Sequence, residues 1–330
     1  MDFFHDHALE LGFVILVTEV ILGLMLLVGA WRSFTLWILF LMISFFTFLT
    51  YYSAAYDAVK ECGCFGDFLH MTPWESFGKD VLLLVLVIIL FIGRKHIKPL
   101  FGKKTENVVL VIFLLFSVCF PLYTYNFLPV KDFRPYAIGK NIQDGMKLPE
   151  GAKTDSIQMV FIYEKGGKQF EFTPEQIKTM DTTYKYVDRK DKVIRKGDQP
   201  AIHDFSITSV DGSEYTDDIL NYDGYYFFLV MYDLNKANKD VFGKINDFVK
   251  LARQDSVPII ALTASADQIE AFKKETGSDI DFYLTDQTTL KTMIRSNPGL
   301  MLLKKGTVTD MWHYYSFPSY SDIKAKHFGK

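Results

Sequence analysis

Residues 11–30, LGFVILVTEVILGLMLLVGA, form an apolar run that is long enough to cross a bilayer as a helix, because about 20 residues span the hydrocarbon core. Three similar runs follow, at about residues 34–56, 77–93 and 108–128. A soluble protein would need a very large core to cover four such runs. The sequence therefore predicts a membrane protein whose residues 1–130 form an all-α bundle of four transmembrane helices.

Composition divides the chain into two parts. Residues 1–130 are rich in Leu, Phe, Val and Ile, whereas residues 131–330 carry most of the Asp, Glu and Lys. The net charge is −3 and the sequence has no clustered basic face, so we expect no nucleic acid as a partner. The expected partner of residues 1–130 is the lipid bilayer. With only three cysteines, Cys62, Cys64 and Cys119, the chain is not a disulfide-stapled secreted scaffold.

Basic residues in a short loop indicate the orientation of the bundle. Residues 94–104, RKHIKPLFGKK, join the third and fourth runs and are expected on the cytoplasmic side. The loop at 57–79 and everything after Leu128 then lie outside. Met1 would also lie outside, without a basic signal-peptide region, so we expect that another helix precedes this start.

Two carboxyl groups fall within or beside the membrane runs. Glu19 lies inside the first run and Asp80 near the start of the third. Charges within the hydrocarbon are costly and often functional. Glu19 is therefore a weak candidate for a functional carboxyl, and a hydrogen bond between helices is an equally good interpretation.

The outward loop holds Cys62-Gly63-Cys64. Outside the cytoplasm disulfides persist, and a ring closed across one glycine would be strained and labile, which favours thiol–disulfide exchange. A purely structural turn is the main alternative, because Gly63 and Gly66 permit unusual backbone angles. A metal site with His70 has less support, since it lacks a second ligand pair, and no metal is expected. Cys119 is interpreted as a small apolar filler.

Three motifs carry a resemblance to a known family. They are CGCFGD at 62–67, followed by Trp74, then DFRPY at 132–136 and IRSNPG at 294–299. With Gly63, Phe65, Gly66 and Asp67 in place, the chain resembles the DoxX-like membrane proteins. The similarity is to the branch related to the methylamine utilisation protein MauE, fused in Bacteroidetes-type bacteria to a soluble domain.

The resemblance implies a bacterial inner-membrane protein with a periplasmic C-terminal domain. The family normally opens with one more helix, which this sequence does not contain. MauE is associated with maturation of a disulfide-rich subunit of methylamine dehydrogenase, and DoxX-like proteins with thiosulfate or quinone redox chemistry. No cofactor is evident in the residues, and the resemblance leaves a quinone as the candidate.

The soluble half begins with a small β-rich linker region at 131–199. Residues 161–172, FIYEKGGKQFEF, predict a hairpin around Gly166-Gly167. Residues 183–197, TYKYVDRKDKVIRKG, predict another pair of strands.

Residues 200–330 predict an α/β domain. Residues 203–220 indicate two strands around Asp211-Gly212 and a helix start, and the apolar runs at 225–234 and 257–265 suit buried strands that alternate with helices. A final strand pair follows Asn297-Pro298, where a cis proline is expected. This order resembles the thioredoxin-like fold of the redoxin type, and Pro298 is a candidate binding residue.

The resemblance fails at one decisive place. The family's Cys-X-X-Cys motif would follow the first buried strand, but residues 233–240 read DLNKANKD. Without a thiolate this domain cannot exchange disulfides by itself.

Two functions remain open, and a transporter is a third interpretation that rests only on Glu19 and Asp80. The first function is a redox or maturation component that passes electrons or disulfides through Cys62 and Cys64 to a periplasmic client or redox partner. As an enzyme it would be a membrane thiol–disulfide/quinone oxidoreductase. The second is a non-catalytic scaffold whose thioredoxin-like domain binds a client.

Overall fold

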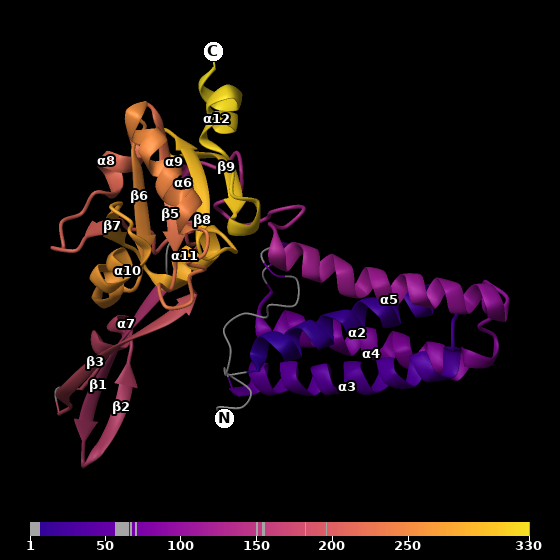
Figure 1. Cartoon of the computed structure of the whole chain (residues 1–330). Coiled ribbons are helices and arrows are strands. Elements are labelled where there is room, and N and C mark those ends of the chain that lie inside the picture. The colour runs from indigo at the N-terminus through magenta and orange to yellow at the C-terminus, as the bar shows by residue number, and fades with distance from the viewer. Residues whose placement is uncertain are drawn as a thin grey trace.

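The first part of the chain is a bundle of long helices, as the sequence predicts (Figure 1). The computed structural model describes residues 7–56, 66, 68–69, 71–149, 151–153, 156–181, 183–195 and 197–329. Within these residues, four helices are long and apolar enough to span a membrane, namely α2 (Ala8–Val28), α3 (Arg32–Tyr56), α4 (Pro73–Ile92) and α5 (Lys103–Asn126). The chain is thus a multi-pass membrane protein.

The bundle hides few side chains, and those it hides are mostly small or polar. Helix α3 packs along α4, and α2 packs along α5. Thr35, Ser76 and Ser117 are buried between helices, whereas most of the large apolar side chains face outward. This distribution is typical of a membrane bundle, where lipid solvates the apolar surface and small residues allow helices to approach.

The turn between α2 and α3 is tied to the loop between α4 and α5. The Val28 carbonyl accepts a hydrogen bond from the Leu100 amide at 2.9 Å, and the Ile97 carbonyl accepts one from Arg32 at 2.8 Å. Gly29 ends α2 with a φ of +68°, and its α-carbon faces the Lys98 carbonyl. These contacts close the bundle at the end opposite the soluble domain.

The soluble domain is built on a six-stranded sheet with the order β4-β7-β6-β5-β8-β9. Its strands are β4 (Thr208–Ser209), β5 (Tyr225–Met231), β6 (Ile259–Thr263), β7 (Asp281–Leu284), β8 (Gly299–Lys304) and β9 (Thr307–His313). Strands β5, β6 and β7 are parallel, and β8 runs antiparallel to both β5 and β9. This βαβ unit followed by a β-hairpin confirms the predicted thioredoxin-like fold.

Helices cover both faces of that sheet (Figure 1). They are α6 (Ile142–Gly145), α8 (Thr216–Leu220), α9 (Phe242–Gln254), α10 (Ile269–Thr276), α11 (Gln287–Met293) and α12 (Tyr320–Ile323). Short helical turns are η2 (Gly93–Lys95), η3 (Ala266–Gln268), η4 (Tyr314–Ser316) and η5 (Lys324–Phe328). Alternate residues of β5 enter the two cores, Phe227 with α9 and α10 and Phe228 with α8 and α11, as the two-residue period of a strand requires.

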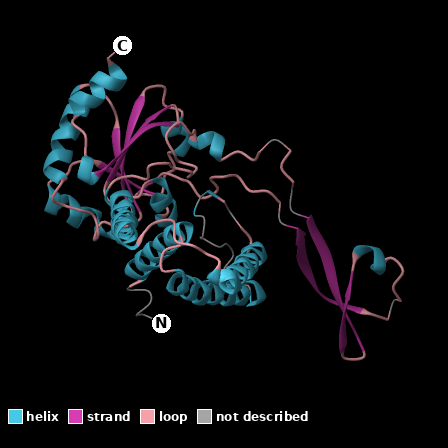
Figure 2. Cartoon of the chain, turned by 90° about the vertical axis from the view of Figure 1, so that its right-hand side faces the viewer, coloured by secondary structure: helices cyan, strands magenta, loops and turns pink. Residues whose placement is uncertain are grey.

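A separate three-stranded sheet stands away from the bundle and from the larger sheet (Figure 2). Its order is β2-β1-β3, with β1 (Ser156–Lys165), β2 (Lys168–Phe172) and β3 (Lys185–Arg195), and a short helix, α7 (Pro174–Ile177), follows β2. Gly166 and Gly167 have φ values of +60° and +75°, which a tight two-residue hairpin turn requires.

Two expectations about strands need correction. The pair of strands predicted at 183–197 is wrong, since β3 is one continuous strand that pairs along the whole length of β1. No Gly, Pro or Asn interrupts that stretch to make a turn. Around Asp211-Gly212 only β4 and an isolated bridge between Thr208 and Glu214 form.

Gly29→Ala should destabilise the bundle. An alanine β-carbon would lie 2.9 Å from the Lys98 carbonyl oxygen and would occupy a left-handed conformation, which costs an ordinary residue about 1–2 kcal/mol. The midpoint of thermal unfolding in detergent should fall by a few degrees. Gly23→Ala is the control, because its β-carbon would meet nothing within 4 Å. Equal midpoints for the two variants would contradict this account.

Candidate functional site

The bundle contains a polar cluster that joins α3 and α4. Asp80 on α4 is 2% exposed, and its carboxylate lies 3.0 Å from the Lys79 ammonium and accepts a hydrogen bond from Thr50 on α3 at 3.0 Å. Glu19 on α2 lies within electrostatic reach of Lys79 and Asp80. The structure therefore brings together the two carboxyl groups selected from the sequence.

The two carboxyl groups have different surroundings. Asp80 is enclosed by protein, whereas Glu19 is exposed on the surface of the bundle. Ser76, one helical turn before Asp80, is also buried, and its hydroxyl has no hydrogen-bond partner among the described residues. The cluster can hold charge and protons within the membrane part, but it specifies no substrate.

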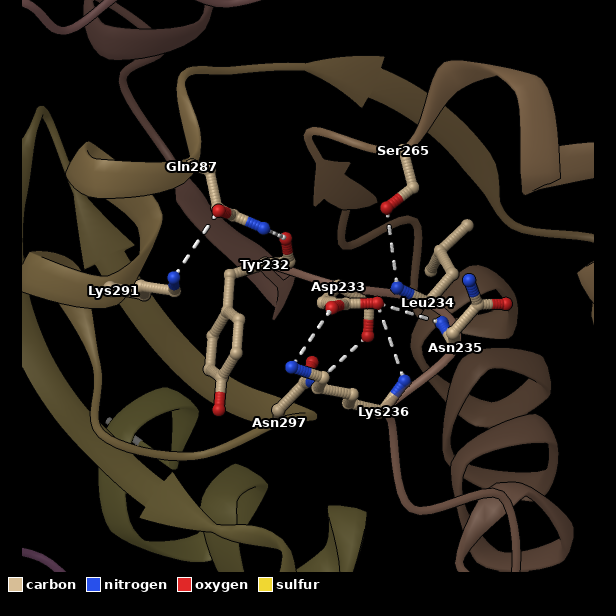
Figure 3. Close-up of polar contacts among 9 residues, drawn as sticks. All are labelled: Tyr232, Asp233, Leu234, Asn235, Lys236, Ser265, Gln287, Lys291 and Asn297. Atoms are coloured by element: carbon tan, nitrogen blue, oxygen red, sulfur yellow. Dashed lines mark hydrogen bonds and ion pairs between the residues drawn. The ribbon is translucent and has the colours of Figure 1, made fainter. Parts of the chain in front are cut away.

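The loop that follows β5 occupies the place of a thioredoxin-like active site (Figure 3). The Asp233 carboxylate accepts hydrogen bonds from the amides of Asn235 at 3.0 Å and Lys236 at 3.4 Å, and Ser265 accepts one from the Leu234 amide at 3.4 Å. An aspartate that bonds to the amides two and three residues ahead forms a compact turn. At the place where thioredoxin-like proteins carry their Cys-X-X-Cys motif, this chain therefore has a turn held by hydrogen bonds from backbone amides to a carboxylate.

This loop is fastened to the turn that carries Pro298. The peptide bond Asn297-Pro298 is cis, as the sequence predicts. The Asn297 side-chain amide donates to the Asp233 carbonyl at 2.7 Å, and the Asn297 carbonyl accepts from the Asn238 amide at 2.9 Å. The Asn297 side-chain oxygen is buried with no partner in the described part of the chain. These hydrogen bonds therefore join residues 233–240 and the Asn297-Pro298 turn into one polar unit.

Aromatic side chains and a histidine adjoin this unit. His313 pairs with Gly299 across β8 and β9, and its Nδ1 accepts a hydrogen bond from the Tyr315 amide at 3.2 Å. Burial lowers the pKa of His313 to about 4, because the imidazolium would lose its hydration. At neutral pH the ring is therefore uncharged. The site offers amides, carbonyls and a neutral imidazole, but no thiol between residues 233 and 240.

The segment after α5 docks the bundle onto this unit. Arg134, 3% exposed, binds the Asp132 carboxylate through two nitrogens and donates to the Thr292 carbonyl at 3.1 Å. The ring of the neighbouring Phe133 lies 4.8 Å from that of Phe68, in the connection between α3 and α4. A cavity of about 320 Å³ there is lined by Phe68, Thr124, Pro129, residues 131–134 and Arg295.

The structure describes only some of the residues selected from the sequence. Cys62, Gly63, Cys64, Phe65 and Asp67 lie outside the described residues, as does His70, and the role assigned to them stays a prediction. Gly66 has a φ of +53°, a value that side-chain-bearing residues rarely adopt. Cys119 is a free cysteine that is exposed on the surface of the membrane-spanning helix α5.

Sequence reasoning missed Thr50, Arg134 and Asn297 as partners. Arg134 and Asn297 lie inside the motifs DFRPY and IRSNPG. Their place in these motifs was the only feature of the sequence that could have marked them as important. Nothing in the sequence around Thr50 distinguishes it from the other hydroxyl residues of α3.

Removing the Asp80 carboxylate should destabilise the bundle more than removing its Thr50 partner. Asp80→Ala takes a partner from the half-buried Lys79 ammonium and from the Thr50 hydroxyl and should cost about 1–3 kcal/mol, whereas Thr50→Val loses one hydrogen bond and should cost about 1 kcal/mol. The double variant should cost less than the sum, because both changes remove the same bond. Unfolding in detergent measures these costs, with the exposed Asp247→Ala as control. Strict additivity would contradict the contact.

His313 should make the protein sensitive to acid. The unfolded chain takes up a proton near pH 6.5, but the folded chain does so only near pH 4. Stability contributed by the neutral ring is thus complete above pH 6.5 and is lost as the pH falls from 6.5 to 4, by up to about 1.4 kcal/mol per pH unit. His313→Asn should flatten the thermal midpoint over this range, while His203→Asn, an exposed control, should not. The reverse pattern would refute the assignment.

Comparisons with known proteins agree with the two-part architecture. Residues 3–93 match the family model described as methylamine utilisation protein MauE, and residues 157–196 match a domain of unknown function, DUF8463. No curated protein matches the chain.

Solved structures are similar to the soluble domain at low identity. A putative protein disulfide isomerase from Bacteroides thetaiotaomicron is 16% identical, with 37% of this chain and 82% of that chain covered and a TM-score of 0.30. A thioredoxin-like protein from Aeropyrum pernix is 14% identical, with 38% and 89% covered and a TM-score of 0.31. StoA from Bacillus subtilis is 16% identical, with 37% and 93% covered and a TM-score of 0.29.

At such identities and scores these likenesses carry no argument about function, and the fold rests on the strand order given above. The match over residues 3–93 concerns the membrane part. Residues 3–93 of the chain thus match the MauE family model, and a thioredoxin-like domain follows the membrane part.

Proposed function

We propose that the protein is a redox or maturation component of the bacterial inner membrane, in which Cys62 and Cys64 exchange disulfides with a periplasmic client. The thioredoxin-like domain supplies the surface that holds the client. The joining of a MauE-family domain to a thioredoxin-like domain supports a role in disulfide chemistry.

The contact between Phe68 and Phe133 carries the proposal. It holds the connection between α3 and α4 against the soluble domain, beside Arg295, which precedes Pro298 by three residues. Cys64 precedes Phe68 by four residues, and such a span reaches at most about 14 Å. A client bound at the Pro298 turn would thus be close to the anchor point of the cysteine loop.

Charge supports the periplasmic side for this chemistry. The soluble domain and Phe68 adjoin the same end of the bundle, whereas Arg94, Lys95 and Lys98 lie at the other end (Figure 1). Short basic loops remain in the cytoplasm. The opposite end therefore faces a compartment in which disulfides persist.

The exchange balances with a quinone as the electron acceptor. A client dithiol attacks the Cys62–Cys64 disulfide, passes through a mixed disulfide and leaves as a disulfide, while Cys62 and Cys64 become thiols. Two electrons and two protons then reduce the quinone to quinol and restore the Cys62–Cys64 disulfide. The absence of cysteine from residues 233–240 gives the soluble domain a binding role in this scheme.

A non-catalytic scaffold is the second candidate. The hydrogen bonds from Asn297 and Asn238 hold residues 233–240 to the proline turn as a fixed polar surface, which suits binding without chemistry. Under this alternative the client would be held for another enzyme, and the two cysteines would be dispensable.

Thiol trapping in living cells separates the two candidates. In a Cys119→Ser background only Cys62 and Cys64 remain to be alkylated. We expect a mixture of reduced and oxidised forms that shifts toward reduced when quinone synthesis is blocked. A pair that stays fully reduced or fully oxidised in both strains would rule out the redox role.

Function after substitution provides the second measurement. We expect Cys62→Ser with Cys64→Ser to abolish client oxidation, while Cys119→Ser alone leaves it intact. If the double variant keeps full function and removal of residues 200–330 does not, the scaffold is the correct interpretation.

A further inference from the structure

A second cavity lies between the bundle and the soluble domain, with a volume of about 520 Å³. Its walls come from the first turns of α2 and the last turns of α5, and the remaining lining comes from the soluble domain. The lining residues are Ala8, Leu9, Gly12, Phe13 and Leu16, then Pro121, Thr124 and Tyr125, then Tyr232, Lys291, Ile294 and Arg295.

The two walls belong to membrane-spanning helices. Helices α2 and α5 pack on each other, and the lining residues lie at the ends nearest the soluble domain. The cavity therefore lies at the level where the hydrocarbon gives way to the headgroup layer. A molecule that resides in this leaflet can reach it sideways, along the exposed apolar surface of Leu9 and Leu16.

The soluble domain adds positive charge and no negative charge to this cavity. Lys291 donates to Gln287 at 3.2 Å and lies 5.6 Å from the centre of the Tyr232 ring (Figure 3). The described residues that line the cavity include no Asp or Glu. Two cations above an apolar pocket complement a molecule with an anionic head and an apolar tail.

We propose that this cavity binds an anionic phospholipid. Its phosphate lies against Lys291 and Arg295, because guanidinium and ammonium groups pair with phosphate through charge-assisted hydrogen bonds. Its acyl chains run along Leu9, Phe13 and Leu16 of α2. The lipid thereby joins the bundle to the soluble domain immediately beside Tyr232, the residue before the Asp233 turn.

Binding can be measured on the full chain in detergent after lipid removal. Phosphatidylglycerol should raise the thermal midpoint in a saturable way and should remain bound in native mass spectrometry, whereas phosphatidylcholine should do neither. Each cation near an anionic headgroup should contribute about fivefold in affinity. Lys291→Gln with Arg295→Gln should therefore weaken binding by about 25-fold. Lys244→Gln with Lys250→Gln on α9 removes the same charge elsewhere and should have no effect.

A second variant tests the apolar part without changing charge. The β-carbon of residue 12 would meet nothing within 4 Å, so Gly12→Leu should fill the cavity, weaken phosphatidylglycerol binding and leave the lipid-free midpoint unchanged.

Four results would overturn the proposal. The first is equal stabilisation by phosphatidylcholine, and the second is an equal loss in the α9 control. The third is full competition by free glycerol phosphate, which would make the site one for a soluble anion. The fourth is saturable stabilisation by ubiquinone alone, which would make it a quinone site. None of these readouts depends on the redox state of the cysteines.

Discussion

A buried guanidinium sets the relation between the two halves of this protein. Arg134 is held by Asp132 and by the Thr292 carbonyl at the end of α11, so the chain leaving α5 is fixed to the soluble domain a few residues beyond the membrane part. A buried arginine that is paired with a carboxylate is costly to displace. The position of Phe133 depends on this attachment, and so does the contact by which Phe133 holds Phe68 of the α3–α4 connection to the soluble domain.

Much of the architecture was accessible from the sequence, because it depends on patterns that repeat over many residues. Twenty apolar residues predict a spanning helix whatever their order, and the alternation of buried runs with amphipathic helices predicts the larger sheet. Single turns and strand lengths were less accessible. The run that forms β3 contains no turn residue, yet its length as one strand depends on β1 being long enough to pair with it.

Some features of the candidate site could likewise be predicted from the sequence, and others could not. Pro298 and its cis peptide bond could be predicted from position, and so could the lack of thiols after β5. The hydrogen bonds from Asn297 to Asp233 and from Thr50 to Asp80 could not, because each joins residues 64 or 30 positions apart whose meeting is decided by packing. Glu19 lies within the membrane-spanning helix α2, as its place in the first apolar run predicts, but its proximity to Lys79 and Asp80 depends on how α2 and α4 are arranged.

The small three-stranded sheet bears on whether copies of this protein associate with one another at the membrane surface. Strand β3 forms one edge of that sheet, and an open edge can recruit a strand from a neighbouring molecule. Along this edge residues 188–191 read Asp-Arg-Lys-Asp and are exposed. A second copy aligning there would have to desolvate these charges. The β3 edge therefore resists self-association, and the sheet can project from the protein without promoting aggregation along this edge.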